Sequence, residues 1–538
     1  MSIKYINNND KVIDNPYLAE LDNVIHPVGI VMPWIKHIIP EEVCKGMVDM
    51  LDSTGWFIKN IDKSPQEYID SHRVLDICCR SGNFLRAFYE RFNVYLSYKI
   101  KNQDKRDYFI WRYLLFGFAG QIREELSKGL TADQENKVAD AAIKELRKEL
   151  YSGFCFYEED FHGNIYDIQF RPYLDGNNLV WTGKDCPGYT TTFENRAFGK
   201  ELNEMKFNAV IGNPPYNNDV YIDFVTKGHA IATDYSLWIT PAKWQAKGGE
   251  KNENFRKNIV PYMSKIVFYP DSKEIFNINM AGGVSYFSVD KAEYTTTHII
   301  NKSVKSKAYN NEQHRKVFNC LNNVLMDFLR NNTIKVWHPL TLDVDYFHAK
   351  IDSNDSGEIT VVSADSSGEF YCLGYCSKNS LTNCGDACKY KVVMCRKQGG
   401  ATISSDKNGM YLGTNKISIL EPNIVTKNEY MILGAFNTLA EAESLKSYLS
   451  ARLVQFIINA SLIGANLTNE ESWRFVPDPG AFDRIFVDKP DPKKQPNAKP
   501  DEDGNYEYNG QKYCSLYKKY NLTPDEINII ESVIKERK

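Results

Sequence analysis

Four consecutive residues, Asn213-Pro214-Pro215-Tyr216, combine side chains and a backbone shape that suit one kind of chemistry. The two prolines stiffen the turn and remove backbone donors. The Asn213 amide and the Pro214 carbonyl supply two hydrogen-bond acceptors, and the Tyr216 ring supplies a surface on which a planar group stacks. This combination fits the exocyclic amine of a nucleobase turned out of its stack. Four residues alone leave open the alternative of a Pro-rich surface turn.

A second segment, DICCRSGNF at residues 76–84, has the small residues that let a ligand approach the backbone at the end of a strand. A glycine in a βα turn is by itself a weak signal. The position of the segment strengthens the case for a ligand site, because it follows an apolar strand predicted at 73–77. It leads into FLRAFYERF, which is predicted to be a helix. This arrangement is typical of the first β-α unit of a doubly wound sheet.

The predicted elements around the two segments position both of them at one sheet edge. FNAVIG at 207–212 is an apolar strand that ends directly at Asn213, and further strands are predicted at 235–239, 265–269 and 284–289. Helical segments lie between the first of these strands. Alternating strands and helices predict an α/β sheet, which places its ligands at the carboxyl ends of its strands.

The pattern changes after about residue 300, where the segments are shorter and rich in Ser, Asn, Gly and Thr. We therefore predict two domains, 1–300 and 301–538. Leucines or isoleucine every fourth residue, from Leu445 to Ile457, predict one helix over about 440–460. Residues 488–511 read as a flexible loop by composition. The last helix begins at Thr523, with Glu526 completing a capping box.

Composition excludes several classes of protein. The chain has 538 residues, of which 43% are hydrophobic and 25% charged, as in ordinary globular proteins. The mean hydropathy of −0.45 and the lack of a long apolar run argue against a membrane protein, and the first residues do not resemble a signal peptide. The 12 cysteines are read as cytosolic thiols. A net charge of −4 neither requires nor excludes a nucleic-acid partner.

Together the two segments resemble the class I S-adenosylmethionine-dependent amino-methyltransferases of DNA. VLDICCRSGNFL resembles their cofactor motif, D-x-x-x-G-x-G, and FNAVIGNPPY resembles their catalytic motif in its adenine-N6 form. From NPPYN through ITPAKWQAKGG to AGGVSYFSVDK the chain is similar to the Eco57I-type restriction-modification methyltransferases. The likeness covers about residues 30–290, with a weaker one near the C-terminus. The order of motifs resembles the gamma arrangement, in which target recognition follows catalysis.

The resemblance implies a Rossmann-like methyltransferase domain followed by a target-recognition domain of α+β structure. It implies a site-specific DNA adenine-N6 methyltransferase that moves the methyl group of S-adenosylmethionine directly to the N6 amine of a flipped adenine in double-stranded DNA. Asn213 and the Pro214 carbonyl would hold the amine, Pro215 would stiffen the turn and Tyr216 would stack on the base. The residues implied to bind the cofactor are Asp76, Cys78, Ser81, Gly82, Asn83 and Phe84, with Pro33 from the preceding segment.

Two positions depart from the family pattern. Arg80 stands where the family usually has its first glycine, and its side chain either narrows the pocket or lies outside it. The second strand usually ends in an acid that binds the cofactor ribose, but Ala119 stands near that position.

Weaker candidates lie on two basic segments and one group of cysteines. Lys243, Trp244 and Lys247 form a loop that either contacts DNA phosphates or is an ordinary solvated loop, and Arg396 and Lys397 are candidates of the same kind. The cysteines favour a free-thiol core over a zinc site, since their spacing matches zinc sites only loosely; they are Cys372, Cys376, Cys384, Cys388 and Cys395.

Three other functions remain open at this stage. The same turn serves enzymes that methylate RNA bases or glutamine side chains, although the long C-terminal region favours DNA. A bifunctional restriction enzyme is disfavoured, because only about 70 residues precede the cofactor motif, too few for a nuclease domain. A restriction endonuclease, if there is one, is then a separate chain. A non-catalytic DNA-binding relative is the third. The family implies a cytoplasmic setting in a bacterial or phage-infected cell.

Overall fold

The computed structural model describes residues 39–121, 132–155, 163–173, 181–183, 185, 206–276, 279–316, 339–341, 347, 357–365, 368–382, 384–462, 467 and 472–537. Pro33 therefore lies outside the described residues. Among those described, no helix is both long and apolar enough to cross a membrane.

A nine-stranded sheet forms the N-terminal half, in the order β11-β10-β8-β9-β7-β6-β1-β2-β3. Neighbouring strands from β3 to β7 run parallel, and β9 is antiparallel to both of its neighbours. The strands are β1 (Val74–Asp76), β2 (Leu115–Phe118), β3 (Ile165–Tyr166), β6 (Phe207–Gly212), β7 (Ala232–Pro241), β8 (Lys265–Tyr269), β9 (Val284–Val289), β10 (Thr296–Asn301) and β11 (Asn311–Lys316).

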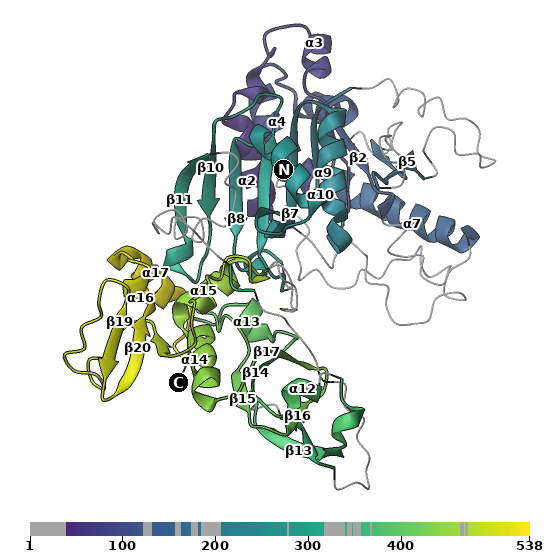
Figure 1. Ribbon diagram of the computed structural model, residues 1–538. Helices are drawn as coiled ribbons and strands as arrows, with labels where there is room; N and C mark the ends of the chain where they lie inside the picture. The colour runs from purple at the N-terminus through teal and green to yellow at the C-terminus, as the bar shows by residue number, and fades with distance from the viewer. Residues whose placement is uncertain are drawn as a thin grey trace.

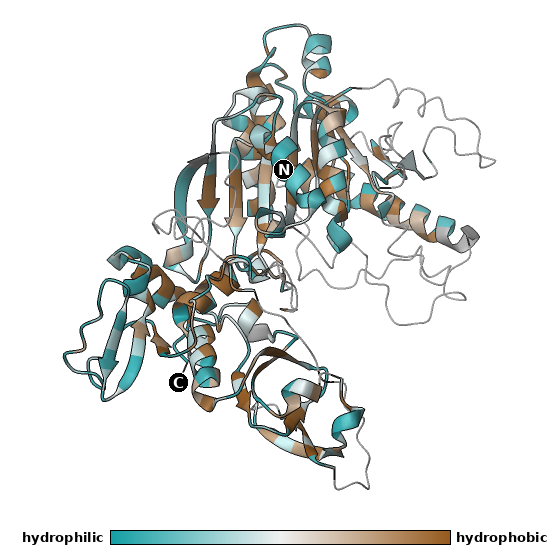
Figure 2. Ribbon diagram, in the orientation of Figure 1, coloured by the Kyte–Doolittle hydropathy of each residue, from teal (hydrophilic) through white to brown (hydrophobic). Residues whose placement is uncertain are grey.

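Hydrophobic cores cover both faces of this sheet, which explains why its central strands are apolar without alternation. On one face α2 (Glu41–Asp52) and α4 (Asn83–Leu96) pack against residues such as Val74 and Ile211. On the other, α9 (Val220–Ile231) and α10 (Glu250–Asn258) pack against residues such as Leu75 and Val210. Figure 2 shows the hydrophobic strands enclosed by helices with hydrophilic outer faces. The predicted α/β fold is confirmed.

The chain reverses its direction of travel across the sheet next to β1. From β1 it goes to β2 and then β3 on one side, and it returns to β6 and then β7 on the other. The resulting switch point lies between β1 and β6, and ligands of α/β sheets bind outside such a point. The segments that the sequence singled out leave these two strands.

The C-terminal part is a group of small sheets and helices that lies beneath one end of the large sheet (Figure 1). Strand β14 (Tyr390–Cys395) is central to one three-stranded sheet, β12 (Ile359–Ala364) to a second, and β20 (Gln511–Ser515) to a third. The large sheet continues through β10 and β11 past residue 300, and the domain boundary expected there stays a prediction. The expected capping box at Thr523 and Glu526 begins α17 (Pro524–Val533).

The single helix predicted over about 440–460 is wrong. The structure has two helices, α14 (Leu439–Ser450) and α15 (Arg452–Ala460), which separate at Ala451, where ψ is 140°. Both carboxylate oxygens of Asp488 accept hydrogen bonds from the first backbone N–H groups of α15, at Arg452 and Leu453. The predicted loop over 488–511 also contains β19 (Asn505–Tyr508), which pairs with β20.

Gly212 generates a testable prediction, because a Cβ there would lie 2.9 Å from Ile77 Cγ2 and 3.1 Å from the Trp238 ring. Gly212→Ala must push β6 from its neighbours, and overpacking of this kind costs about 1–3 kcal/mol. We expect a lower Tm, by roughly 2–4 °C for each kcal/mol. Gly385→Ala is the matched control, since a Cβ there meets nothing within 4 Å. Equal Tm values for the two variants, measured by differential scanning calorimetry, would contradict close β1–β6 packing.

Candidate functional site at the switch point

The turns after β1 and β6 lie side by side because their strands pair in parallel. Asp76 is in register with Ile211, and Ile77 donates its backbone N–H to the Ile211 carbonyl at 2.9 Å. Asn213 follows two residues later. The structure therefore brings together the two segments that lie far apart in sequence.

Asn213 is 5% exposed, and its buried side-chain oxygen Oδ1 has no hydrogen-bond partner among the residues that the structure describes. A buried acceptor without a donor is costly, so its presence marks a place where a donor is expected to bind. Pro214 is buried, and Pro215 and Tyr216 are half-buried. The Tyr216 ring packs edge-on against Phe276, with 6.3 Å between ring centroids.

Asp76 ends β1 as a buried carboxyl group, and its Oδ1 accepts the Cys78 backbone N–H at 3.1 Å. Burial raises the pKa of Asp76 to about 7, against the smaller lowering effects of hydrogen bonds from Cys78 and Cys79 and of the Arg80 charge. A cation that binds next to a buried carboxyl group stabilises its ionised form.

Gly82 closes the turn in the left-handed region, with φ +70°, directly before α4. Arg86, one turn into α4, is buried and donates hydrogen bonds to the Ser81 carbonyl and to Asn83 Oδ1, which fixes the turn. Asn83 in turn donates to the Ile39 carbonyl at 3.3 Å. The Phe84 side chain is 4% exposed and belongs to the hydrophobic core beneath α4.

Arg80, the departure from the family pattern, is half-buried and lies near both turns. Its charge lowers the pKa of Asp76 and of the Tyr216 hydroxyl, in each case against the larger raising effect of burial. The guanidinium therefore acts on the site itself.

Two buried polar residues at this edge were missed by the sequence analysis. Gln121 follows β2, and its Nε2 donates to the Ile77 carbonyl at 3.4 Å. Its buried Oε1 has no partner in the described part of the chain. Asp167 follows β3 directly and is 2% exposed. An acid after a short apolar pair, as in IYD at 165–167, is a signal that could have indicated the second; an isolated glutamine gives none.

The segment after β7 contains Lys243, Trp244 and Lys247 and is called the lysine loop here. It begins at the same edge of the sheet, because β7 runs parallel to β6. Lys243 and Lys247 form ion pairs with Asp219, just after Tyr216. Trp244 is fully buried and packs edge-on against Phe255 and Phe287, so it presents no surface to DNA in this structure.

Arg396 and Lys397 follow β14 in the C-terminal part, where Arg396 is half-buried and Lys397 exposed. The free-thiol core expected there is wrong for three of the five cysteines, because Cys372, Cys384 and Cys388 are exposed. In the part of the chain that the structure describes, no three His, Cys, Asp or Glu side chains gather as a metal site.

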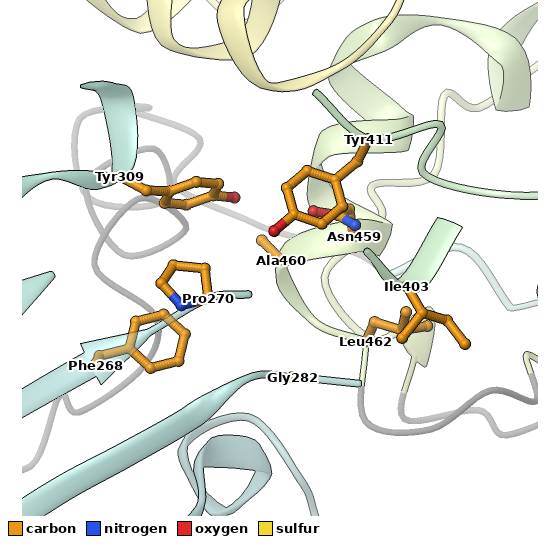
Figure 3. A pocket seen from close by; sticks show the side chains of 9 residues that line it. All are labelled: Phe268, Pro270, Gly282, Tyr309, Ile403, Tyr411, Asn459, Ala460 and Leu462. Atoms are coloured by element: carbon orange, nitrogen blue, oxygen red, sulfur yellow. The ribbon is translucent and has the colours of Figure 1, made fainter. Parts of the chain in front are cut away.

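The C-terminal part contacts the large sheet at this same edge. Arg474 donates a hydrogen bond to the Ala246 carbonyl at 3.3 Å, and Ser405 donates to Asp271 at 2.8 Å. A small cavity at this junction is lined from both sides, with the Tyr309 and Tyr411 hydroxyls pointing toward one another (Figure 3). The second part of the chain is thus built against the edge that carries the candidate site.

No protein-family model matches the chain. Over 181 residues, or 30% of this chain, it is 26% identical to an "Uncharacterized adenine-specific methylase" of Mycoplasma pneumoniae (strain ATCC 29342 / M129 / Subtype 1). The match spans 40% of that protein's length.

Two solved structures are also similar. The Type IIL restriction-modification enzyme MmeI in complex with DNA aligns at a TM-score of 0.41 and 10% identity, over 94% of this chain and 76% of MmeI. The Type I restriction enzyme EcoKI M protein aligns at a TM-score of 0.27 and 13% identity, over 45% of this chain and 47% of the EcoKI chain.

The raised pKa of Asp76 predicts how the stability of the fold changes with pH. A carboxyl group whose pKa is raised on folding stabilises the fold fully below its usual pKa of about 4, and this contribution is lost as pH rises through about 7. Each pKa unit is worth roughly 1.4 kcal/mol. Asp76→Asn cannot ionise, so its Tm should fall less than that of the wild type between pH 5 and 8. Parallel Tm profiles would show that Asp76 is ionised throughout.

Proposed function

We propose that this protein is a DNA adenine-N6 methyltransferase that uses S-adenosylmethionine. The observation that carries the proposal is the buried Asn213 oxygen without a donor, at a switch point next to the Asp76 turn. The relative named an adenine-specific methylase supports it. We further propose the Eco57I-type gamma class, with residues 1–300 as the methyltransferase domain and 301–538 as the target-recognition domain.

The side chains of the site would act on the amine as hydrogen-bond acceptors. Asn213 Oδ1 and the Pro214 carbonyl receive the two N–H groups of the adenine amine, which directs the nitrogen lone pair away from the protein. Tyr216 stacks on the base, and the stiff Pro215 keeps these groups in place. No group on the protein forms a covalent bond, so the rate enhancement comes from positioning and electrostatics.

The residues present fit the proposed cofactor, which supplies a methyl group on a positively charged sulfonium. Asp76 is a buried carboxyl group suited to a nearby cation, and Gln121 Oε1 is a buried acceptor suited to a hydroxyl or amine. The turn that follows Asp76 contains Cys78, Ser81, Gly82 and Asn83, and Phe84 supports it from the core. Gln121 would thus replace the acid that Ala119 does not supply.

DNA contacts would come from Lys243 and Lys247 and, in the recognition domain, from Arg396 and Lys397. The partner is double-stranded DNA in the cytoplasm of a bacterial or phage-infected cell, with any restriction endonuclease on a separate chain.

Methyl transfer tests the proposal directly. Purified protein is incubated with unmethylated genomic DNA and tritiated S-adenosylmethionine, the DNA is digested to nucleosides, and the labelled base is identified. We expect label in N6-methyladenine. Asn213→Ala removes one acceptor and should reduce the rate by about 100-fold or more, in the range measured for one preorganised hydrogen-bonding group. Asn254→Ala, on the exposed face of α10, is the control and should keep full activity. DNA without label in N6-methyladenine would refute the proposal.

Cofactor binding tests the role of Gln121. Gln121→Met keeps the shape but removes the acceptor, and a lost hydrogen bond of about 0.5–1.5 kcal/mol corresponds to roughly 2- to 12-fold weaker binding. Isothermal titration calorimetry with S-adenosylhomocysteine measures this without turnover. Gln121→Glu, which keeps an acceptor at the same place, should bind more tightly than Gln121→Met. Equal affinity of Gln121→Met and wild type would remove Gln121 from the site.

A further inference from the structure

A group of three charges, the buried Asp219 carboxylate and two half-buried lysines, joins the NPPY turn to the lysine loop. Lys243 lies on η6 (Ala242–Gln245), directly after β7, and Lys247 follows it. Both ammonium groups meet the carboxylate of Asp219: Lys243 Nζ lies 2.8 Å from Oδ1, and Lys247 Nζ lies 2.5 Å from Oδ2. Asp219 is 7% exposed and comes three residues after Tyr216.

Asp219 adopts a backbone conformation that asparagine and aspartate tolerate better than other residues with a Cβ, although at some cost in free energy. Its φ is +58° and that of Asn218 is +50°, both in the left-handed region. Asp219 is also the N-cap residue of α9, a position where aspartate usually accepts a hydrogen bond from the helix, and here its side chain makes no such bond. Asp219 therefore lacks both a favourable backbone conformation and a capping hydrogen bond, and its carboxylate instead contacts the two lysines.

The charges of this group do not balance. Two ammonium groups face one carboxylate, and their side chains are only 18% and 27% exposed. Burial would raise the pKa of Asp219, but the two lysines outweigh it and hold that pKa below its usual value. One excess positive charge is left in a poorly solvated place, where an anion would bind strongly.

Neighbouring arginines fix the loop through its backbone carbonyls. Arg256 donates hydrogen bonds to the Trp244 and Lys247 carbonyls at 2.6 and 2.7 Å, and Arg474 reaches Ala246 from the C-terminal part. The Asn252 amide lies 3.5 Å from Asp219 Oδ2. By contrast, Lys251 on the same surface has its own partner, Asp223, at 2.6 Å.

We propose that Asp219 is a positioning residue that holds Lys243 and Lys247 as a fixed pair to bind a backbone phosphate of DNA, next to the nucleotide whose base reaches Asn213. This inference rests on the proposed function, since it takes DNA as the substrate. It deepens that function, because the pair would fix the sugar-phosphate backbone while the base is held by the turn three residues upstream of Asp219.

Salt dependence of DNA binding tests the phosphate contact. Fluorescence anisotropy with a labelled random-sequence duplex, at 50–200 mM salt, gives the slope of log K against log[salt]. The variant Lys243→Met/Lys247→Met/Asp219→Asn removes all three charges together, so no unpaired charge is left, and asparagine tolerates the left-handed backbone at position 219. Each phosphate contact contributes about 0.9 to the slope, so this triple variant should lose roughly one unit. A folded triple variant with the wild-type slope would overturn the proposal.

Asp219→Asn tests the positioning role. It leaves both lysines charged, so affinity for the duplex should stay the same or rise, while the single-turnover rate of methyl transfer should fall by about 10-fold or more. Affinity for S-adenosylhomocysteine should not change. A purely structural role predicts the opposite pattern, with Tm and cofactor affinity falling and DNA affinity falling with them. Asp223→Asn, which breaks the one-to-one pair on the same helix, is the control and should leave rate and slope unchanged.

The outcomes separate this inference from the proposed function. If the wild type binds the duplex but transfers no methyl group to adenine, the proposed function fails and the salt slope alone decides the phosphate contact. If the wild type does not bind the duplex, the phosphate contact is overturned. If Asp219→Asn keeps the full rate, Asp219 does not position the lysines for the reaction.

Discussion

The parallel pairing of β1 with β6 is the constraint on which the rest of the site depends. It sets Asp76 opposite Ile211, so the two turns that follow emerge side by side at one edge. The close approach requires Gly212, because any side chain there would collide with Ile77. Two side chains hold these turns in place. Arg86 on α4 donates a hydrogen bond to the turn after β1, and Asp219 joins the turn after β6 to the loop after β7.

The site contains buried polar groups that lack hydrogen-bond partners among the described residues. Asn213 Oδ1 and Gln121 Oε1 are buried acceptors without donors, and the pKa of the Asp76 carboxyl is raised by burial. Each such group costs stability, and titratable groups with perturbed pKa values often lie at functional sites. Under the proposed function, a donor and a cation would bind these groups.

The C-terminal part shares this edge, and its contacts give it a physical connection to the site. Arg474 contacts the lysine loop at Ala246, and Ser405 contacts Asp271 after β8. Under the proposed function, a DNA duplex held by the C-terminal part would lie against the same edge.

The sequence by itself determined the α/β fold, most strands of the large sheet and the two turns, because strands buried on both faces are continuous apolar runs and glycine and proline mark their ends. The tertiary structure decided what depends on contacts between distant residues. The order of the strands places Gln121 next to the first turn and Asp219 next to the lysines. Trp244 is buried although it lies in a basic segment. The break at Ala451 arises because Asp488, far along the chain, caps the second helix, and no local pattern of leucines records a cap supplied from elsewhere.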